Sequence, residues 1–418
     1  MLAEAANPEW VSVPLVGWSL FDAVRRVADV HLVTQIRNRD AILRAGLVEG
    51  RDFTVIDTER LERPLWKLGK TLRLGWTSKM ALNALSYPYF ERLVWARFGD
   101  EILSGAYDIV HRVTPLSPTV TSSIAARCAA AGIPFVLGPL NGGLPWPQEF
   151  DAARRKEKEW LSYIRGAYRL TPGRRRMLEA TSALLAGSRH TASELPGDLQ
   201  DRVTYLPENA IETKRFGQPV ERPSPPPLRA CFVGRLVPYK GPDMLLEAAA
   251  PLLADGRLTL DIVGDGPMMS ELRAFVTEHD LGSAVTFHGW VTHEEVPRIL
   301  GRAHVLTFPS IREFGGGVVL EAMALGVVPI VVDYGGPGEL VGETTGYKVP
   351  IGPRPQIVAA LQDRLVRLAA APEVLAPLSA AARDEVLENF TWDAKARKIL
   401  SVYTRLRPPG ARADTASM

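Results

Sequence analysis

The sequence predicts an α/β protein with two doubly wound parallel-sheet domains. Three observations support this. Short apolar runs alternate with segments of helical spacing, which is typical of parallel sheets. The alternation occurs twice along the chain. Between the two series lies Gln218–Pro227 (QPVERPSPPP), whose prolines lack a backbone donor and exclude a helix interior or a central strand.

With 418 residues, the chain is long enough for two domains that each have a core. We expect residues 1–217 to form the first domain, whose first strand is short or truncated. Residues 218–227 should form the linker and 228–390 the second domain. Residues 391–418 should form a C-terminal helix, for which packing back on the first domain is one option, and a flexible tail.

The predicted elements of the second domain follow one another closely in the sequence. Its strands are expected at 228–233, 258–263, 285–287, 305–309 and 328–332, and its helices at 244–253, 268–278, 296–300 and 318–325. The first domain shows the same alternation of strands and helices less regularly, with strands expected at 30–34, 109–113, 135–138 and 183–187.

Composition excludes several classes of protein. Hydrophobic residues make up 46% of the chain and charged residues 23%, which is typical of a globular protein. The net charge of +2 argues against a general nucleic-acid binder. Cys128 and Cys231 lie far apart, so neither a disulfide framework nor a thiolate zinc site is indicated. We expect a cytoplasmic protein with neither a signal peptide nor a membrane span.

The most informative segment is Pro309–Glu321, in which Glu313 and Glu321 flank the glycines Gly315, Gly316 and Gly317. Glycines let a ligand approach the backbone, and the helix that follows directs its N–H groups outward, which favours an anion. The two acids suit hydroxyl groups instead. A Glu in a first helical turn is also a common partner of the helix dipole, so the pair alone is weak evidence.

A second loop, Gly234–Gly241, places Arg235 and Lys240 between a strand and a helix. Arginine binds a diphosphate through its planar fork and lysine as a compact charge. Two ordinary surface charges remain the alternative interpretation.

The sequence from Phe314 to Pro329, which follows Glu313, resembles the signature of the family 4 retaining glycosyltransferases, in which two acids separated by seven residues hold a nucleotide sugar. The resemblance implies the GT-B fold, two such domains facing a central cleft, in which residues 1–217 form the acceptor-side domain and residues 228–390 the nucleotide-sugar-binding domain. It also implies catalytic roles for Arg235, Lys240 and Glu313. The donor-binding residues that it implies are Gly234, Arg235, Lys240, Gly264, Gly266, Pro267, Glu313, Phe314, Gly315, Gly316, Gly317, Val318, Val319 and Glu321.

In the first domain the resemblance implies a catalytic His111 at the end of the strand Tyr107–His111. Asn141, Gly142 and Gly143 match loops that face the acceptor or the donor sugar, although a tight structural turn is an equal alternative. One segment departs from the family: relatives carry a glycine-bearing loop after the first strand, whereas this chain has Val11 and Val13 there.

The predicted function is therefore metal-independent transfer of a hexosyl unit from a UDP- or GDP-linked sugar to a saccharide or lipid-linked acceptor, in polysaccharide or glycolipid synthesis. No cofactor, metal or nucleic acid is expected. A nonhydrolysing sugar-nucleotide epimerase and a catalytically silent interaction protein stay as alternatives. Basic and aromatic residues interleave over 60–98, and basic clusters occur at 154–156 and 174–176. They indicate either peripheral contact with the inner membrane surface or a solvated helical face.

Overall fold

The computed structural model describes residues 1–60, 76–150, 172–217 and 220–407. It divides the chain into two compact units, which are described here one by one. Unit 1 contains Met1–Gly142, Leu161–Glu208 and Trp392–Met418, and unit 2 contains Gly143–Trp160 and Asn209–Thr391. The chain therefore crosses between the units four times. The basic cluster at 154–156 and residues 61–75 of the predicted basic and aromatic surface lie outside the described residues.

Unit 1 is built on a parallel sheet of seven strands in the order β3-β2-β1-β4-β5-β6-β7. Its strands are β1 (Leu2–Ala3), β2 (Leu32–Gln35), β3 (Phe53–Ile56), β4 (Val110–Thr114), β5 (Phe135–Leu140), β6 (Ala183–Ala186) and β7 (Val203–Tyr205). Its helices are α1 (Val13–Val24), η1 (Ile36–Asn38), α2 (Arg39–Arg44), α4 (Trp76–Leu103), α5 (Ser123–Ala130), α7 (Arg174–Glu179), α8 (Arg189–Ser193), η4 (Gly197–Arg202) and α17 (Trp392–Leu406).

Two hydrophobic clusters cover the faces of this sheet. One joins Phe90, Val94 and Phe98 of α4 to Ile124 of α5 and the strand residue Phe135. The other joins Leu20 and Phe21 of α1 to Ala396 and Ile399 of α17, so the last described helix completes a core that begins with the first. Strands buried on both sides explain the uninterrupted apolar runs of the sequence.

Unit 2 is built on a parallel sheet of six strands in the order β10-β9-β8-β11-β12-β13. Its strands are β8 (Leu228–Val233), β9 (Leu258–Val263), β10 (Val285–Gly289), β11 (Val305–Phe308), β12 (Val328–Val332) and β13 (Tyr347–Val349). Its helices are η2 (Gln148–Phe150), α9 (Thr213–Phe216), η5 (Pro238–Lys240), α10 (Pro242–Ala254), α11 (Met269–Glu278), α12 (Val296–Leu300), α13 (Gly317–Ala324), α14 (Gly335–Leu340), α15 (Arg354–Ala370), η6 (Pro372–Val374) and α16 (Leu375–Asn389).

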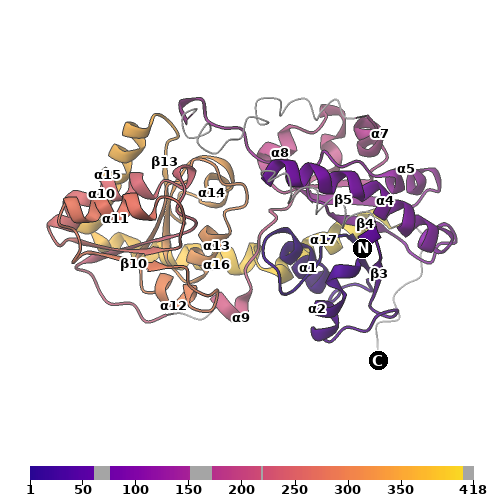
Figure 1. Ribbon diagram of the computed structural model, residues 1–418, viewed down its shortest axis with the longest axis horizontal. Helices are drawn as coiled ribbons and strands as arrows, with labels where there is room; N and C mark the ends of the chain where they lie inside the picture. The colour runs from indigo at the N-terminus through magenta and orange to yellow at the C-terminus, as the bar shows by residue number, and fades with distance from the viewer. Residues whose placement is uncertain (61–75, 151–171, 218–219, 408–418) are drawn as a thin grey trace. The chain divides into compact units, whose positions relative to one another are not determined.

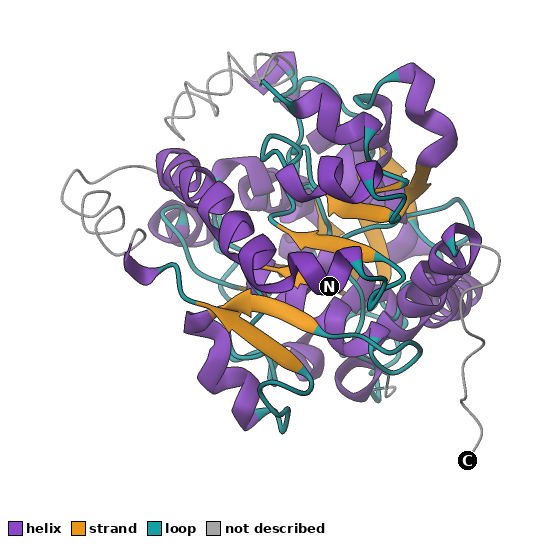
Figure 2. Ribbon diagram, turned by 90° about the vertical axis from the view of Figure 1, so that its right-hand side faces the viewer, coloured by secondary structure: helices purple, strands orange, loops and turns teal. Residues whose placement is uncertain are grey.

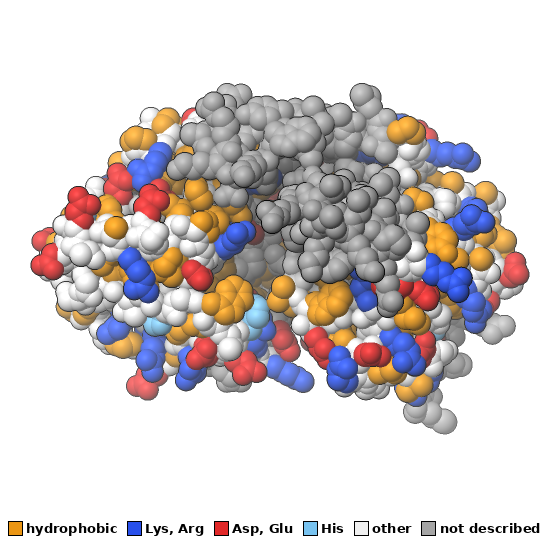
Figure 3. Space-filling view, in the orientation of Figure 1, with side chains coloured by type: hydrophobic (Ala, Val, Ile, Leu, Met, Phe, Trp, Pro, Cys, Tyr) orange, Lys and Arg blue, Asp and Glu red, His pale blue; other side chains and the backbone are white. Residues whose placement is uncertain are grey.

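The predicted fold class is confirmed, because both sheets are parallel and carry helices in their crossover connections (Figures 1 and 2). Among the described residues, no single helix has the length and apolar content needed to cross a bilayer; one pair passes that test jointly, Arg354–Ala370 with Pro372–Asn389, bent by 100°. Ile357, Leu361 and Val386 of this pair are buried in the core of unit 2. On the face drawn in Figure 3, acidic and basic side chains are interspersed over the described surface.

Candidate active site

The strand order of unit 2 reverses between β8 and β11, which are neighbours in the sheet. At such a switch point the loops that follow the two strands run in opposite directions and leave a crevice, where open α/β sheets bind ligands. The loop after β8 carries Arg235 and Lys240, and the loop after β11 carries Glu313. The topology therefore brings three of the predicted catalytic residues to one end of the sheet.

Glycines hold the loop after β8 against the loop after β9. A Cβ atom on Gly264, whose φ is +131°, would lie 2.0 Å from the carbonyl oxygen of Gly234. One on Gly266 would lie 2.4 Å from the carbonyl oxygen of Leu236. The packing leaves Arg235 exposed, and among the described residues nothing pairs with its guanidinium. Arg235 is thus an available cation at the switch point, and Pro267 is exposed in the neighbouring loop.

Lys240 lies at the end of η5, just before α10. Gly241 makes the turn between them with φ +69°, and a Cβ there would lie 2.7 Å from the carbonyl oxygen of Pro309. The ammonium group of Lys240 forms an ion pair with Glu313 and lies 4.9 Å from the centre of the Phe308 ring. Both charged side chains are largely buried, so each neutralises the other in a partly desolvated position.

Glu313 also organises the glycine loop that precedes α13. Its second carboxylate oxygen accepts a hydrogen bond from Gly316 N at 3.3 Å, and its carbonyl oxygen accepts one from Gly336 N at 2.9 Å. Gly316 has φ +59°, and a Cβ atom there would lie 3.2 Å from Pro337 N. The carboxylate therefore holds the loop in the conformation that starts the helix.

The helix α13 begins at Gly317, one residue before the predicted start. The first N–H groups of a helix have no partner within it and favour an anion. A Cβ atom on Gly317 would lie 3.4 Å from the Asn209 amide, so the glycine leaves room beside the helix terminus. The side chain of Val319 is fully buried and its N–H donates to Gly316 O, so it offers a ligand neither group.

Glu321 lies one turn into α13, where its carboxylate is 3.9 Å from the guanidinium of Arg215 in α9. Burial raises the pKa of this carboxyl group to about 7, and the charge of Arg215 only partly offsets the effect. An acid with a pKa near neutrality exists in both its protonated and its ionised form at neutral pH. A ligand that donates a hydrogen bond to the carboxylate favours the ionised form. Sequence reasoning missed Arg215, because nothing in Lys214-Arg215 distinguishes it from a surface basic pair.

Three further residues that were predicted to bind the donor lie in the glycine loop and at the start of α13. Phe314 and Val318 are half-buried, and Gly315 is buried. A Cβ on Gly336 would lie 2.1 Å from Phe314 O, which shows how closely the start of α14 packs on this loop.

The position predicted for His111 is wrong. It is the second residue of β4 rather than the last residue of a strand, and only 2% of it is exposed. Its Nε2 donates to Gly138 O at 2.7 Å, and its Nδ1 accepts from the Tyr403 hydroxyl at 2.6 Å. Burial lowers the pKa of the imidazole to about 3. His111 is therefore neutral and bonded on both sides, tying β4 to β5 and α17.

Two of the tentative acceptor-side residues lie in unit 1. Asn141 follows β5 and donates from its side chain to Glu208 at 2.8 Å, while Gly142 N donates to the Thr191 hydroxyl at 3.0 Å. Gly143, with φ +70°, already belongs to unit 2. The Asn-Gly-Gly turn is thus one of the crossings between the units.

The loop after β1 departs from the glycine-bearing loop expected of relatives. Ser12 occupies a conformation with φ +65° and ψ −138°, which only glycine adopts without strain. Val11 next to it is 62% exposed. The backbone thus makes a glycine-like bend at a position that carries serine.

Two doubly wound parallel sheets, one of which has cations and a helix N-terminus at its switch point, are the architecture of the GT-B fold. Comparison with known proteins agrees. Residues 216–383 match the model of the family described as Glycosyl transferases group 1. The chain is a glycosyltransferase, and residues 216–383, which lie in unit 2, are similar to the glycosyl transferases of group 1.

Relatives extend the likeness into unit 1. A 2-deoxystreptamine glucosyltransferase of Streptomyces kanamyceticus is 29% identical over 308 residues, which cover 71% of this chain and 76% of the relative. A D-inositol 3-phosphate glycosyltransferase of Frankia alni is 29% identical over 329 residues, which cover 73% of this chain and 76% of the relative. The crystal structure of HepE from Anabaena in complex with UDP shares the fold, with a TM-score of 0.60, 14% identity, and coverage of 97% of this chain and 98% of that one.

Proposed function

We propose that the protein transfers a hexosyl unit from a UDP- or GDP-linked sugar to a hydroxyl group of a saccharide or lipid-linked acceptor, with retention of the anomeric configuration and without a metal. The observation that carries this proposal is the switch point of unit 2, where Arg235, Lys240 and the N-terminus of α13 gather positive charge beside two carboxyl groups. The UDP bound to HepE and the transferase names of the relatives support it.

The chemistry follows from where charge develops. The bond between the anomeric carbon and the diphosphate oxygen breaks, and its electron pair leaves with the diphosphate. Arg235, Lys240 and the helix N–H groups stabilise that negative charge, as preorganised donors do in a transition state. The acceptor hydroxyl oxygen bonds to the anomeric carbon on the face that the diphosphate leaves. Its proton passes to a diphosphate oxygen, so no further base is needed.

The two carboxyl groups take different roles in this scheme. Glu321 accepts hydrogen bonds from the ribose hydroxyl groups, because it lies inside α13 behind the helix N-terminus. Glu313 accepts hydrogen bonds from the donor sugar. In the free protein Lys240 and Gly316 N occupy its two oxygens, so it exchanges partners when the donor binds.

Turnover of a panel of UDP- and GDP-sugars tests the proposal. Release of nucleoside diphosphate that rises on addition of an acceptor mixture, with a sugar product of unchanged anomeric configuration by NMR, is the expected result. Full conversion of a labelled sugar nucleotide to its epimer without acceptor would instead identify an epimerase. Absence of binding and turnover with every donor would identify a silent interaction protein.

A role in polysaccharide or glycolipid synthesis, in the cytoplasm and with contact at the inner membrane surface, is part of the same proposal. The described cysteines, Cys128 and Cys231, are free, buried and in different units, which is compatible with a reducing compartment. Flotation with anionic vesicles tests the membrane contact.

A further inference from the structure

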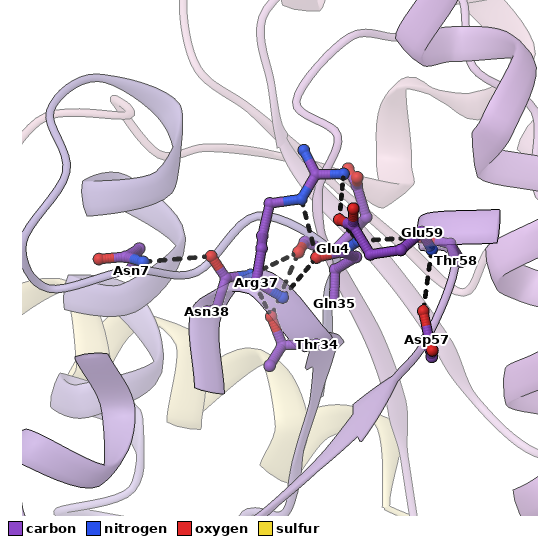
Figure 4. Close-up of polar contacts among 9 residues, drawn as sticks. All are labelled: Glu4, Asn7, Thr34, Gln35, Arg37, Asn38, Asp57, Thr58 and Glu59. Atoms are coloured by element: carbon purple, nitrogen blue, oxygen red, sulfur yellow. Dashed lines mark hydrogen bonds and ion pairs between the residues drawn. The ribbon is translucent and has the colours of Figure 1, made fainter. Parts of the chain in front are cut away.

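Arg215 and Glu321 of unit 2 carry opposite charges and lie close together without forming a hydrogen bond. Polar groups inside a protein usually satisfy one another. Asn38 of unit 1 is an example, because its amide group donates to Glu4 O and to the Thr34 hydroxyl, both at 2.9 Å (Figure 4). In contrast, Arg215 Nη2 lies 3.9 Å from Glu321 Oε1, which exceeds the length of a charge-assisted hydrogen bond. The two groups attract each other but leave hydrogen-bonding capacity unused.

Neither group finds a hydrogen-bond partner elsewhere in the described part of the chain. No residue there donates to the Glu321 carboxylate, and Arg215 Nε is buried without an acceptor. Both side chains are largely covered, with 31% of Arg215 and 22% of Glu321 exposed, so each remains reachable. Donors and acceptors that are withdrawn from water and unpaired gain most from a ligand that pairs with them.

The segment that carries Arg215 lies along the first turn of α13. Asn209 lies beside Gly317 at the start of the helix, where a Cβ atom on the glycine would be 3.4 Å from the Asn209 amide. Arg215 lies beside Glu321, one turn further on. The guanidinium carbon of Arg215 is 4.7 Å from the centre of the buried Phe216 ring, and such stacking fixes the plane of the guanidinium group. A ligand that binds the N-terminus of α13 and extends along its first turn therefore meets both charged groups.

We propose that Arg215 binds the nucleotide together with Glu321, by donating a hydrogen bond to a ribose hydroxyl group that itself donates to the carboxylate. A hydroxyl group suits both partners, because it has one hydrogen to donate and lone pairs with which to accept. This inference rests on the proposed function, which assigns Glu321 to the ribose, and adds Arg215 as a residue that makes the site selective for ribonucleotides. A deoxyribose that lacks the hydroxyl group leaves the guanidinium and the carboxylate unpaired.

Calorimetric titrations of the full chain test the proposal without requiring an acceptor. The probes are UDP, GDP, and the 2′-deoxy and 3′-deoxy analogues of whichever of the two binds more tightly. Arg215→Met keeps the aliphatic part of the side chain but removes its charge and every donor, and Arg215→Lys keeps a charged donor. The matched control is Lys214→Met in the same helix, because Lys214 is exposed and forms no hydrogen bond or ion pair with any described residue.

We expect wild type to bind the ribonucleotide about tenfold or more tightly than at least one of its deoxy analogues, the typical effect of a charge-assisted hydrogen bond. Arg215→Met should weaken the ribonucleotide by a similar factor. It should weaken that deoxy analogue by less than about threefold, because the analogue lacks the group that Arg215 binds. Arg215→Lys should lose less ribonucleotide affinity than Arg215→Met, and Lys214→Met should change each affinity by less than about twofold.

Equal affinity of wild type for the ribonucleotide and both deoxy analogues would overturn the proposal, and this result requires no variant. A folded Arg215→Met protein that keeps wild-type affinity would also overturn it. So would one that loses the same factor for the ribonucleotide and its analogues, as a purely structural role of Arg215 would give. A wild type that binds neither UDP nor GDP would contradict the proposed function instead, so the two failures are distinguishable in one set of titrations.

Discussion

The titration of Glu321 gives a quantitative test of how unit 2 binds a nucleotide. Burial raises the pKa of this carboxyl group to about 7, so the free protein is mostly protonated there at pH 6 and mostly ionised at pH 8. A ribose diol donates hydrogen bonds, and the ionised carboxylate accepts them best. We therefore expect nucleoside diphosphate affinity to increase with pH across this interval.

The magnitude follows from the ionised fraction. With a pKa of about 7, roughly one tenth of the molecules carry the carboxylate at pH 6 and about nine tenths at pH 8. Because apparent affinity scales with the competent fraction, wild type should bind UDP or GDP about eight- to tenfold more tightly at pH 8. Glu321→Gln removes the titrating group and a charge-assisted bond of about 1.5 to 3 kcal/mol, which is tenfold or more in affinity at pH 8.

Calorimetry in buffers of different ionisation enthalpy measures both effects. The nucleotide's own phosphate titration is common to wild type and variant, so the difference between their pH profiles reports Glu321. Glu313→Gln is the matched control: its carboxylate pairs with Lys240 in the free protein, so its removal frees a cation and should not weaken the bare nucleotide. Identical pH profiles for wild type and Glu321→Gln, or weakening confined to Glu313→Gln, would refute the assignment of the two acids.

Three further changes probe the rest of the account. Arg235→Ala combined with Lys240→Ala should lower turnover by at least about 100-fold, as expected on losing transition-state donors, and normal turnover of the folded double variant would remove the diphosphate assignment. Activity should survive excess chelator; complete loss that a divalent ion restores would contradict the metal-free scheme. Tyr403→Phe leaves the buried Nδ1 of His111 without its hydrogen-bond donor, so unit 1 should lose about 1 to 3 kcal/mol of stability in thermal unfolding. The affinity for the nucleotide sugar should not change, and unaltered stability would show that the hydrogen bond contributes little.

The strands of unit 2 were predictable because apolar runs end at glycine, proline or polar residues. β8, β9 and β12 have the predicted bounds. β1 is only two residues long, and β7 and β13 are three residues long each, so these strands have little periodicity to detect. The chain's crossing into unit 2 at Gly143 also left no compositional signal.

The candidate site was predictable as a set of loops but not as a set of contacts. Glycine and charge spacing indicated Arg235, Lys240 and Glu313, because each loop carries its own local pattern. The ion pair of Lys240 with Glu313 joins residues 73 positions apart, and the approach of Arg215 to Glu321 depends on how α9 packs in unit 2. For His111, a strand boundary misplaced by a few residues turned a buried, bonded side chain into a predicted catalytic one.

Hydrogen–deuterium exchange with and without UDP or GDP tests the central claim most directly, because it locates nucleotide binding without requiring an acceptor. The account predicts slower exchange in Gly234–Gly241 and in the segment from Glu313 to Glu321, which meet at the switch point of unit 2. It predicts loss of that protection in the Arg235→Ala, Lys240→Ala double variant. Nucleotide binding that protects other segments and leaves these two unchanged would contradict it.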